Sequence, residues 1–160
     1  GVQADVYVLA KGLASGYPIS AVLFREELGS WPPGAHGTTF GGQAVAAAAA
    51  HATLDLLEGG LQENAARLGE FLLAELRALK RRFPFLGDVR GRGLMIGLDF
   101  GDPDHPQPDL RDKAVRLAFE KGLLLLPAGP SALRIAPPLV LTQEEAALGL
   151  EILEEVFRAL

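Results

Sequence analysis

The feature that most constrains this chain is a run of apolar residues, 6–10, that ends at Lys11-Gly12. A short, continuous apolar run is typical of a strand buried on both faces, as in parallel sheets. A second β-like run covers residues 19–24. Two strands cannot cover themselves, so a sheet that contains them needs neighbours. We therefore expect residues 1–59 to be the end of a larger α/β unit whose other strands lie upstream.

Helical patterns follow. Residues 44–58 predict a helix whose alanine-rich first half packs closely on something, and Gly59-Gly60 ends it. Residues 61–82 predict a second helix, because apolar residues recur at alternating intervals of four and three. These residues are Leu61, Ala65, Leu68, Leu72, Leu76, Leu79 and Phe83.

The remaining residues predict a small α/β domain. Strands are expected at 94–100, 123–126 and 133–136, with a helix at 109–121 and a turn at 90–93. A last helix opens at Thr142, which forms a capping-box pattern with Glu145. The sequence thus predicts an α/β chain with two parts, 1–59 and 60–160.

Composition excludes several classes of protein. Hydrophobic residues make up 49% and charged residues 22%, as in ordinary globular proteins, and the formal net charge of -5 argues against nucleic-acid binding. Cysteine is absent, which excludes disulfides and thiolate metal sites. The longest apolar stretch, 44–50, is too short to span a bilayer, and residues 1–5 lack a signal-peptide pattern. We expect a cytoplasmic protein with no nucleic-acid or membrane partner.

Lys11 is the first candidate for chemistry. It closes an apolar strand, and open α/β sheets place ligands at the carboxyl ends of strands. An amine that is desolvated there becomes available for Schiff-base formation. The alternative is a lysine at the end of a strand that simply reaches water.

The second candidate is the glycine-rich segment 36–42, with Thr38 and Thr39, which precedes the predicted helix 44–58. Hydroxyls, glycines and a helix N-terminus together form a plausible phosphate cradle. The alternative is a glycine-rich turn with a threonine cap. No Gly-Lys-Ser/Thr follows, so the segment is not a Walker loop.

Arg134 is the third candidate, because it lies in an apolar strand before Pro137-Pro138. A guanidinium in such a place needs a carboxylate, which is either that of a substrate or that of a structural Asp or Glu. The acidic loop around Asp102 and His105 lacks regular ligand spacing, so we expect it to be solvated, with no metal site.

Four segments taken together resemble the class III aminotransferases, a family that includes 4-aminobutyrate, ornithine and acetylornithine aminotransferases. They are DVYVLAKGL (5–13), HGTTFGG (36–42), RGRGLM (90–95) and RIAPPL (134–139), and they occur in the family's order and at matching separations. The resemblance covers essentially all 160 residues. One departure is Gln43-Ala44, where the family often has Asn-Pro.

The resemblance implies the C-terminal part of a fold type I enzyme that uses pyridoxal 5'-phosphate (PLP). Residues 1–59 would end the large PLP-binding domain, and residues 60–160 would form the small C-terminal domain. The lysine that matches Lys11 forms the Schiff base with PLP and then shuttles a proton between substrate and cofactor. The threonine that matches Thr39, beside Thr38, binds the phosphate of the neighbouring subunit's PLP. The arginine that matches Arg134 holds a substrate carboxylate.

The resemblance also implies amino-group transfer from an ω-amino acid, such as 4-aminobutyrate or ornithine, to a 2-oxo acid in a homodimer with shared active sites. The family's phosphate loop, its aromatic that stacks on PLP and its pyridine-binding Asp precede the lysine motif. We therefore expect these 160 residues alone to be incomplete and inactive. Two alternatives stay open, a PLP-dependent racemase of the same family and a non-catalytic dimerising fragment.

Overall fold

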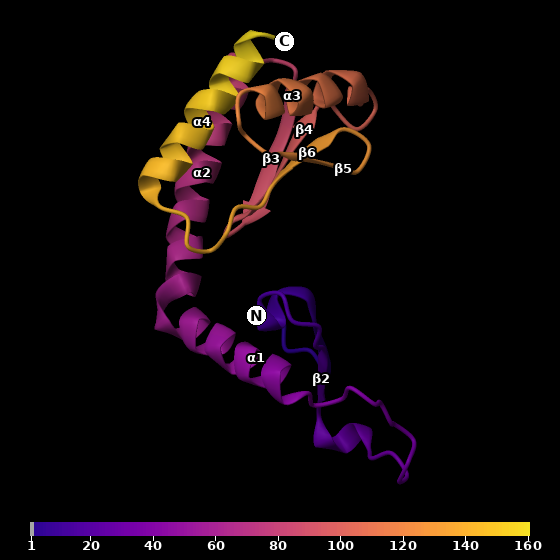
Figure 1. The fold of residues 1–160 in the computed structure, drawn as a ribbon. Helices are drawn as coiled ribbons and strands as arrows, with labels where there is room; N and C mark the ends of the chain where they lie inside the picture. The colour runs from indigo at the N-terminus through magenta and orange to yellow at the C-terminus, as the bar shows by residue number, and fades with distance from the viewer. Residues whose placement is uncertain (1) are drawn as a thin grey trace. The chain divides into compact units, whose positions relative to one another are not determined.

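The computed structural model of the protein describes residues 2–160. The chain divides into two compact units, one ending at Gly60 and the other covering Leu61–Leu160 (Figure 1). Each unit contains both strands and helices, which confirms the predicted α/β class. Within residues 2–160, no helix has the length and apolar character that crossing a membrane requires.

The first unit begins with a two-stranded ribbon. Strand β1 (Val6–Leu9) pairs with β2 (Ala21–Phe24) in antiparallel fashion, with Val6 opposite Phe24. The strand predicted at residues 6–10 is therefore present, but its partner among residues 2–160 is antiparallel, where a parallel one was expected. All residues of β1 are exposed, because a ribbon of two strands has no layer to cover its faces.

A short helical turn packs on an alanine-rich helix in the same unit. The turn is η1 (Lys11–Ala14), the helix is α1 (Ala44–Leu56), and a further turn, η2 (Glu26–Leu28), follows β2. Ala14 and Ala46 are almost fully buried, since small side chains allow the two backbones to approach closely. The side-chain oxygens of Ser15 and Thr53 also lie 3.0 Å apart. The predicted close packing of this helix is confirmed at its contact with η1.

Helix α1 passes into a π-type turn, η3 (Leu57–Leu61), in which Gly60 has a φ of 122°. This conformation is open to glycine and strained for other residues, so Gly60 interrupts the helix as the sequence predicted.

The second unit places three helices on one face of a four-stranded sheet. The helices are α2 (Gln62–Arg82), α3 (Pro108–Glu120) and α4 (Gln143–Arg158). The strands are β3 (Leu86–Arg92), β4 (Met95–Phe100), β5 (Leu126–Ala128) and β6 (Ala132–Ile135). Their order is β3-β4-β6-β5, and all neighbours are antiparallel. The three predicted helices are confirmed.

Two predictions in this unit are wrong. Residues 90–92 belong to β3 instead of a turn, and glycines concealed the strand pattern. Gly91 is needed there, because a Cβ on it would lie 2.5 Å from the carbonyl oxygen of Met95. The strand predicted at 123–126 begins only at Leu126, because the N–H of Leu123 donates to the carbonyl of Ala118 and so completes the end of α3.

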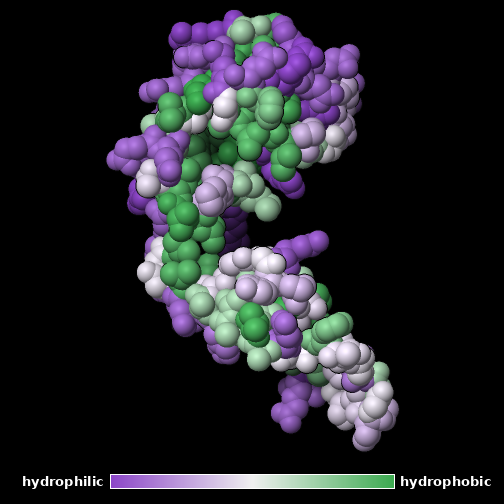
Figure 2. Space-filling view, viewed as in Figure 1, coloured by the Kyte–Doolittle hydropathy of each residue, from purple (hydrophilic) through white to green (hydrophobic). Residues whose placement is uncertain are grey.

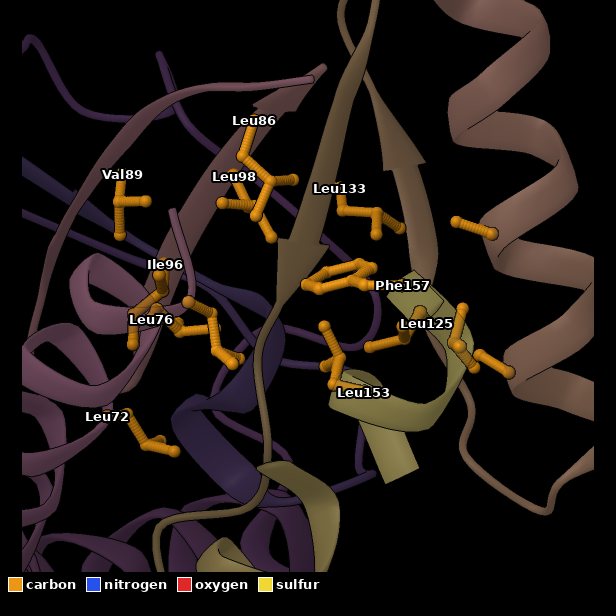
Figure 3. Packing of buried hydrophobic residues seen from close by; sticks show 14 of the residues in the cluster. Leu72, Leu76, Leu86, Val89, Ile96, Leu98, Leu125, Leu133, Leu153 and Phe157 are labelled. Atoms are coloured by element: carbon orange, nitrogen blue, oxygen red, sulfur yellow. The ribbon is translucent and has the colours of Figure 1, made fainter. Parts of the chain in front are cut away.

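The core of the second unit lies between the sheet and the helices. Ile96, Leu98 and Leu133 point from the strands toward Leu76 of α2 and Phe157 of α4 (Figure 3). All of these are almost fully buried. The space-filling view shows hydrophobic residues of this unit as a green band beside hydrophilic residues in purple (Figure 2). Because the strands alternate, the opposite face of the sheet carries the intervening residues, among them Arg90, Asp99 and Arg134.

Candidate active site

Lys11 begins the turn η1, and one residue, Ala10, separates it from the end of β1. Its φ is 59°, and among residues 2–160 only Ser15, at 45°, is another non-glycine residue with a positive φ. The left-handed conformation is strained for a residue with a Cβ, and such strain is concentrated at functional positions. The side chain of Lys11 is exposed in this chain, so the expected desolvation of its amine is not met within residues 2–160. The reason is the uncovered ribbon from which it emerges.

Thr38 and Thr39 lie in the glycine-rich turn before α1, and both are exposed. The N–H of Gly41 donates to the carbonyl of Thr38 over 3.3 Å, and a Cβ on Gly41 would clash with the methyl group of Thr38. Gly42 has a φ of 67°. The turn therefore depends on its glycines, which leave its backbone open to a ligand.

An open hollow of about 470 Å³ lies beside this turn. Thr38, Gly41, Gly42 and Gln43 line it together with Ser20, whose hydroxyl the sequence analysis did not single out. The side chain of Gln43 accepts a hydrogen bond from the N–H of Ala46, so α1 keeps a capped start although Gln43-Ala44 departs from the family pattern. Hydroxyls, glycine backbone and a helix N-terminus are suited to a phosphate group.

Arg134 lies in β6, directly opposite Gly97 of β4 and Leu126 of β5. Its neighbour Leu133 points into the core, so Arg134 projects from the opposite face, where it is exposed. No carboxylate of residues 2–160 forms an ion pair with it. Within residues 2–160 the guanidinium of Arg134 therefore has no acidic partner.

Arg90 lies on the same face of the sheet and is paired. Its Nη2 donates to Oδ1 of Asp99 over 3.1 Å, its Nη1 donates to Oδ2 of Asp99, and Nη1 lies 3.2 Å from Oδ2 of Asp88. These hydrogen bonds, first to Asp99 and then to Asp88, raise the pKa of Arg90 above its ordinary value. Sequence reasoning missed this pair, because it placed residue 90 in a turn and not on the exposed face of a strand.

The acidic loop has a structural explanation. Oδ1 of Asp102 accepts hydrogen bonds from the N–H groups of His105 and Asp104, at 2.8 and 2.9 Å, and these lower the pKa of Asp102. Within the described residues, no group of His, Asp and Glu side chains has an arrangement that could hold a metal ion.

The structure thus brings only some of the candidates together. Thr38 and Thr39 are adjacent in one turn, whereas Lys11 does not line the hollow beside Thr38. Lys11 and the two threonines belong to the first unit, and Arg134 belongs to the second.

Comparison with known proteins identifies the family, since the family model described as "Aminotransferase class-III" matches residues 1–157. The chain belongs to the class III aminotransferases. These are PLP-dependent enzymes of fold type I, so the predicted family and fold class are confirmed. The exposed Lys11 offers an amine and the glycine-rich turn an open backbone of N–H groups, and both fit this cofactor.

The relatives agree with this membership. The chain is 40% identical to the acetylornithine aminotransferase of Oceanobacillus iheyensis, over 98% of this chain and 38% of that protein. It is also 40% identical to the alanine/serine racemase of Pyrococcus horikoshii, over 98% of this chain and 34% of that protein. The crystal structure of an acetylornithine aminotransferase from Elizabethkingia anophelis superimposes with a TM-score of 0.88 at 34% identity, covering 99% of this chain and 42% of that one. The class III chain therefore spans less than half the length of these relatives.

Proposed function

We propose that the protein carrying this chain transfers an amino group from an ω-amino acid, of the ornithine or N-acetylornithine class, to a 2-oxo acid. The observation that carries the proposal is the strained, exposed Lys11 at the end of β1, in a chain that matches the aminotransferase family from residue 1 to 157. Relatives named acetylornithine and ornithine aminotransferases favour these donors over 4-aminobutyrate.

Lys11 is the proposed attachment and proton-transfer residue. PLP, when bound, supplies the electron sink that stabilises a carbanion at the substrate carbon. The amine of Lys11 would hold the cofactor through its aldehyde group. The same amine, when it does not hold the cofactor, would carry the proton at the substrate carbon. The left-handed backbone at Lys11 sets the direction in which its side chain leaves the strand.

The glycine-rich turn is the proposed phosphate site. The hydroxyls of Thr38 and Thr39 and the N–H groups of the turn are suited to donate hydrogen bonds to a phosphate, and Gly41 and Gly42 let it approach the backbone. We propose that Thr39 binds the PLP phosphate of a second copy of the protein, in a homodimer. Exposed apolar residues on β1 and β2 support the need for further covering surface.

Arg134 is the proposed carboxylate-binding residue. An exposed guanidinium with no acidic partner in residues 2–160 is suited to a bidentate pair with the carboxylate of an amino acid or 2-oxo acid. In this proposal the first unit is the end of the large PLP-binding domain, and the second is the small C-terminal domain.

Borohydride trapping tests the role of Lys11. The full-length gene product is mixed with PLP, reduced, digested and searched for a peptide that carries the pyridoxyl mass. We expect the label on Lys11, its loss in Lys11→Ala, and its retention in Lys80→Arg, a change at an exposed lysine of α2. Labelling of a different lysine in the unaltered protein would overturn the assignment.

A racemase is the second candidate, because the Pyrococcus relative named alanine/serine racemase is as similar as the first aminotransferase relative. Single-enantiomer substrates separate the two activities. Incubation with L-alanine or L-serine alone yields the D-enantiomer if the protein is a racemase. Consumption of ornithine or N-acetylornithine only when 2-oxoglutarate is also present supports the aminotransferase.

A further inference from the structure

Two arginines lie in one row on the exposed face of the second unit's sheet, with a glycine between them. Arg90 of β3 is opposite Gly97 of β4, and Gly97 is opposite Arg134 of β6. A Cβ on Gly97 would lie 3.8 Å from the Cζ atom of Arg90, so this guanidinium lies over the glycine. No side chain of β4 therefore separates the two arginines along this row.

Asp99 is within reach of both arginines. It lies two residues beyond Gly97 on β4, on the same face, and is opposite Ala132 of β6. It is thus a diagonal neighbour of Arg134, a distance of about 7–8 Å between backbones that long side chains can bridge. Arg90 is the other long cation beside it.

Arg90 engages the whole carboxylate of Asp99. Each oxygen of Asp99 accepts a hydrogen bond from one terminal nitrogen of Arg90, and Asp88 adds a further contact to the same guanidinium. Such bidentate pairing fixes the orientation of both groups. The carboxylate is therefore directed toward β3, and Arg134 has no ion-pair partner within residues 2–160.

We infer that Arg90 is a positioning residue that holds Asp99 away from Arg134 and so keeps the Arg134 guanidinium available to a substrate carboxylate. The inference rests on the proposed function, in which Arg134 binds that carboxylate. Without Arg90, the Asp99 carboxylate loses its partner, and Arg134 is the next cation across the sheet. An Asp99–Arg134 pair would then compete with the substrate.

Binding of glutarate tests this inference without turnover. Glutarate is a dicarboxylate with neither amino nor oxo group, and its Kd is measured by calorimetry on the full-length gene product loaded with PLP. Because exposed ion pairs are weak, we expect Arg90→Gln to raise the Kd by about threefold to tenfold. The double variant R90Q/D99N removes the competing charge and should restore the Kd. KM for the carboxylate substrates should follow the same pattern, with kcat changing less.

Arg92→Gln is the matched control. Arg92 lies two residues further along β3 on the same face, and within residues 2–160 it forms no ion pair, so its removal should leave the Kd unchanged. An unchanged Kd in R90Q overturns the inference. A raised Kd that D99N does not restore also overturns it, because Arg90 would then act only by stabilising the β3–β4 hairpin.

Arg134→Gln separates failure of the inference from failure of the proposed function. A weakened Kd in R134Q together with an unchanged Kd in R90Q overturns the role of Arg90 alone. An unchanged Kd in R134Q would show that Arg134 does not bind the carboxylate, and it would overturn both the proposed function of Arg134 and the role inferred for Arg90.

Discussion

Gly69 of α2 packs directly on the backbone of Gly93, in the turn that joins β3 to β4. A Cβ on Gly69 would clash with the carbonyl group of Gly93. Gly93 itself has a φ of 54°, as a tight two-residue connection between β3 and β4 requires. The helix can therefore approach the hairpin this closely only because Gly69 has no side chain.

We expect Gly69→Ala to destabilise the fold by about 1–3 kcal/mol, because the new methyl group meets rigid backbone. Gly149 of α4 is the matched control, since its nearest neighbour would be Cδ1 of Leu123 at 3.9 Å. Gly149→Ala should be neutral or stabilise by up to about 1 kcal/mol through helix propensity. Urea denaturation measures both. Equal effects of the two substitutions would contradict the close approach at Gly69.

The capping box at the start of α4 yields a second prediction. Thr142 Oγ1 accepts from the N–H of Glu145 over 3.2 Å, and Glu145 Oε2 accepts from the N–H of Thr142 over 2.9 Å. Thr142→Ala should cost about 1 kcal/mol, because it leaves a helix N–H without its acceptor. Thr142→Ser keeps the hydroxyl and should retain most of the stability. The midpoint of urea denaturation distinguishes the two, and a serine variant as unstable as the alanine variant would be inconsistent with the cap.

Local sequence signals predicted the helices of this chain well. The stripe in residues 61–82 and the pairing of Thr142 with Glu145 involve neighbours within one or two helical turns, and α2 and α4 lie where these patterns placed them. Family motifs also identified the fold, because their order along the chain is itself sequence information.

The sequence did not predict which residues of neighbouring strands pair with one another. Gly87 and Gly91 hid the alternation of β3, since glycine has no side chain to show which face it occupies. The pairing of Arg90 with Asp99 depends on the register of β3 against β4, and that register is set by long-range packing. The burial of β1 likewise depends on neighbours that the strand's own residues do not specify.

Arg111 is a buried cation that the sequence analysis did not single out. It lies in α3, and its Nη1 donates to the carbonyl of Ala132 over 3.1 Å and reaches that of Ala128 at 3.5 Å. Its Nε donates to Asp112 over 2.6 Å. It thus ties the helix to the β5–β6 connection.

We expect Arg111→Met to destabilise the fold by about 1–3 kcal/mol, because the carbonyl of Ala132 loses its charged donor in a buried place. Arg116→Met is the control. Arg116 is exposed on the same helix, and no hydrogen bond from its side chain is present in residues 2–160, so its loss should change stability little. Thermal denaturation of the two variants tests the difference, and equal melting temperatures would argue against a stabilising hydrogen bond from Arg111 to the carbonyl of Ala132.

Glu154 of α4 makes the stability of this protein depend on pH. Its carboxylate accepts from Arg82 of α2 at 2.8 and 2.6 Å and also from Arg158. The hydrogen bonds from Arg82, with the nearby charge of Arg158, lower the pKa of Glu154 below its ordinary value of 4.5. A carboxylate with a lowered pKa in the folded state stabilises the fold when it is ionised.

This contribution is therefore fully present at pH values above the unfolded-state pKa near 4.5, and it is lost as the pH falls through the lower folded-state pKa. We expect Glu154→Gln to reduce stability at pH 7 and to converge with the unaltered protein in acid. Glu151 lies on the same helix and forms no ion pair within residues 2–160. The stability of Glu151→Gln should therefore change with pH in the same way as that of the unaltered protein. Denaturation midpoints measured from pH 7 down to pH 3 give the comparison. A constant gap between E154Q and the unaltered protein over that range would show that the Arg82 pair does not act through ionisation of Glu154.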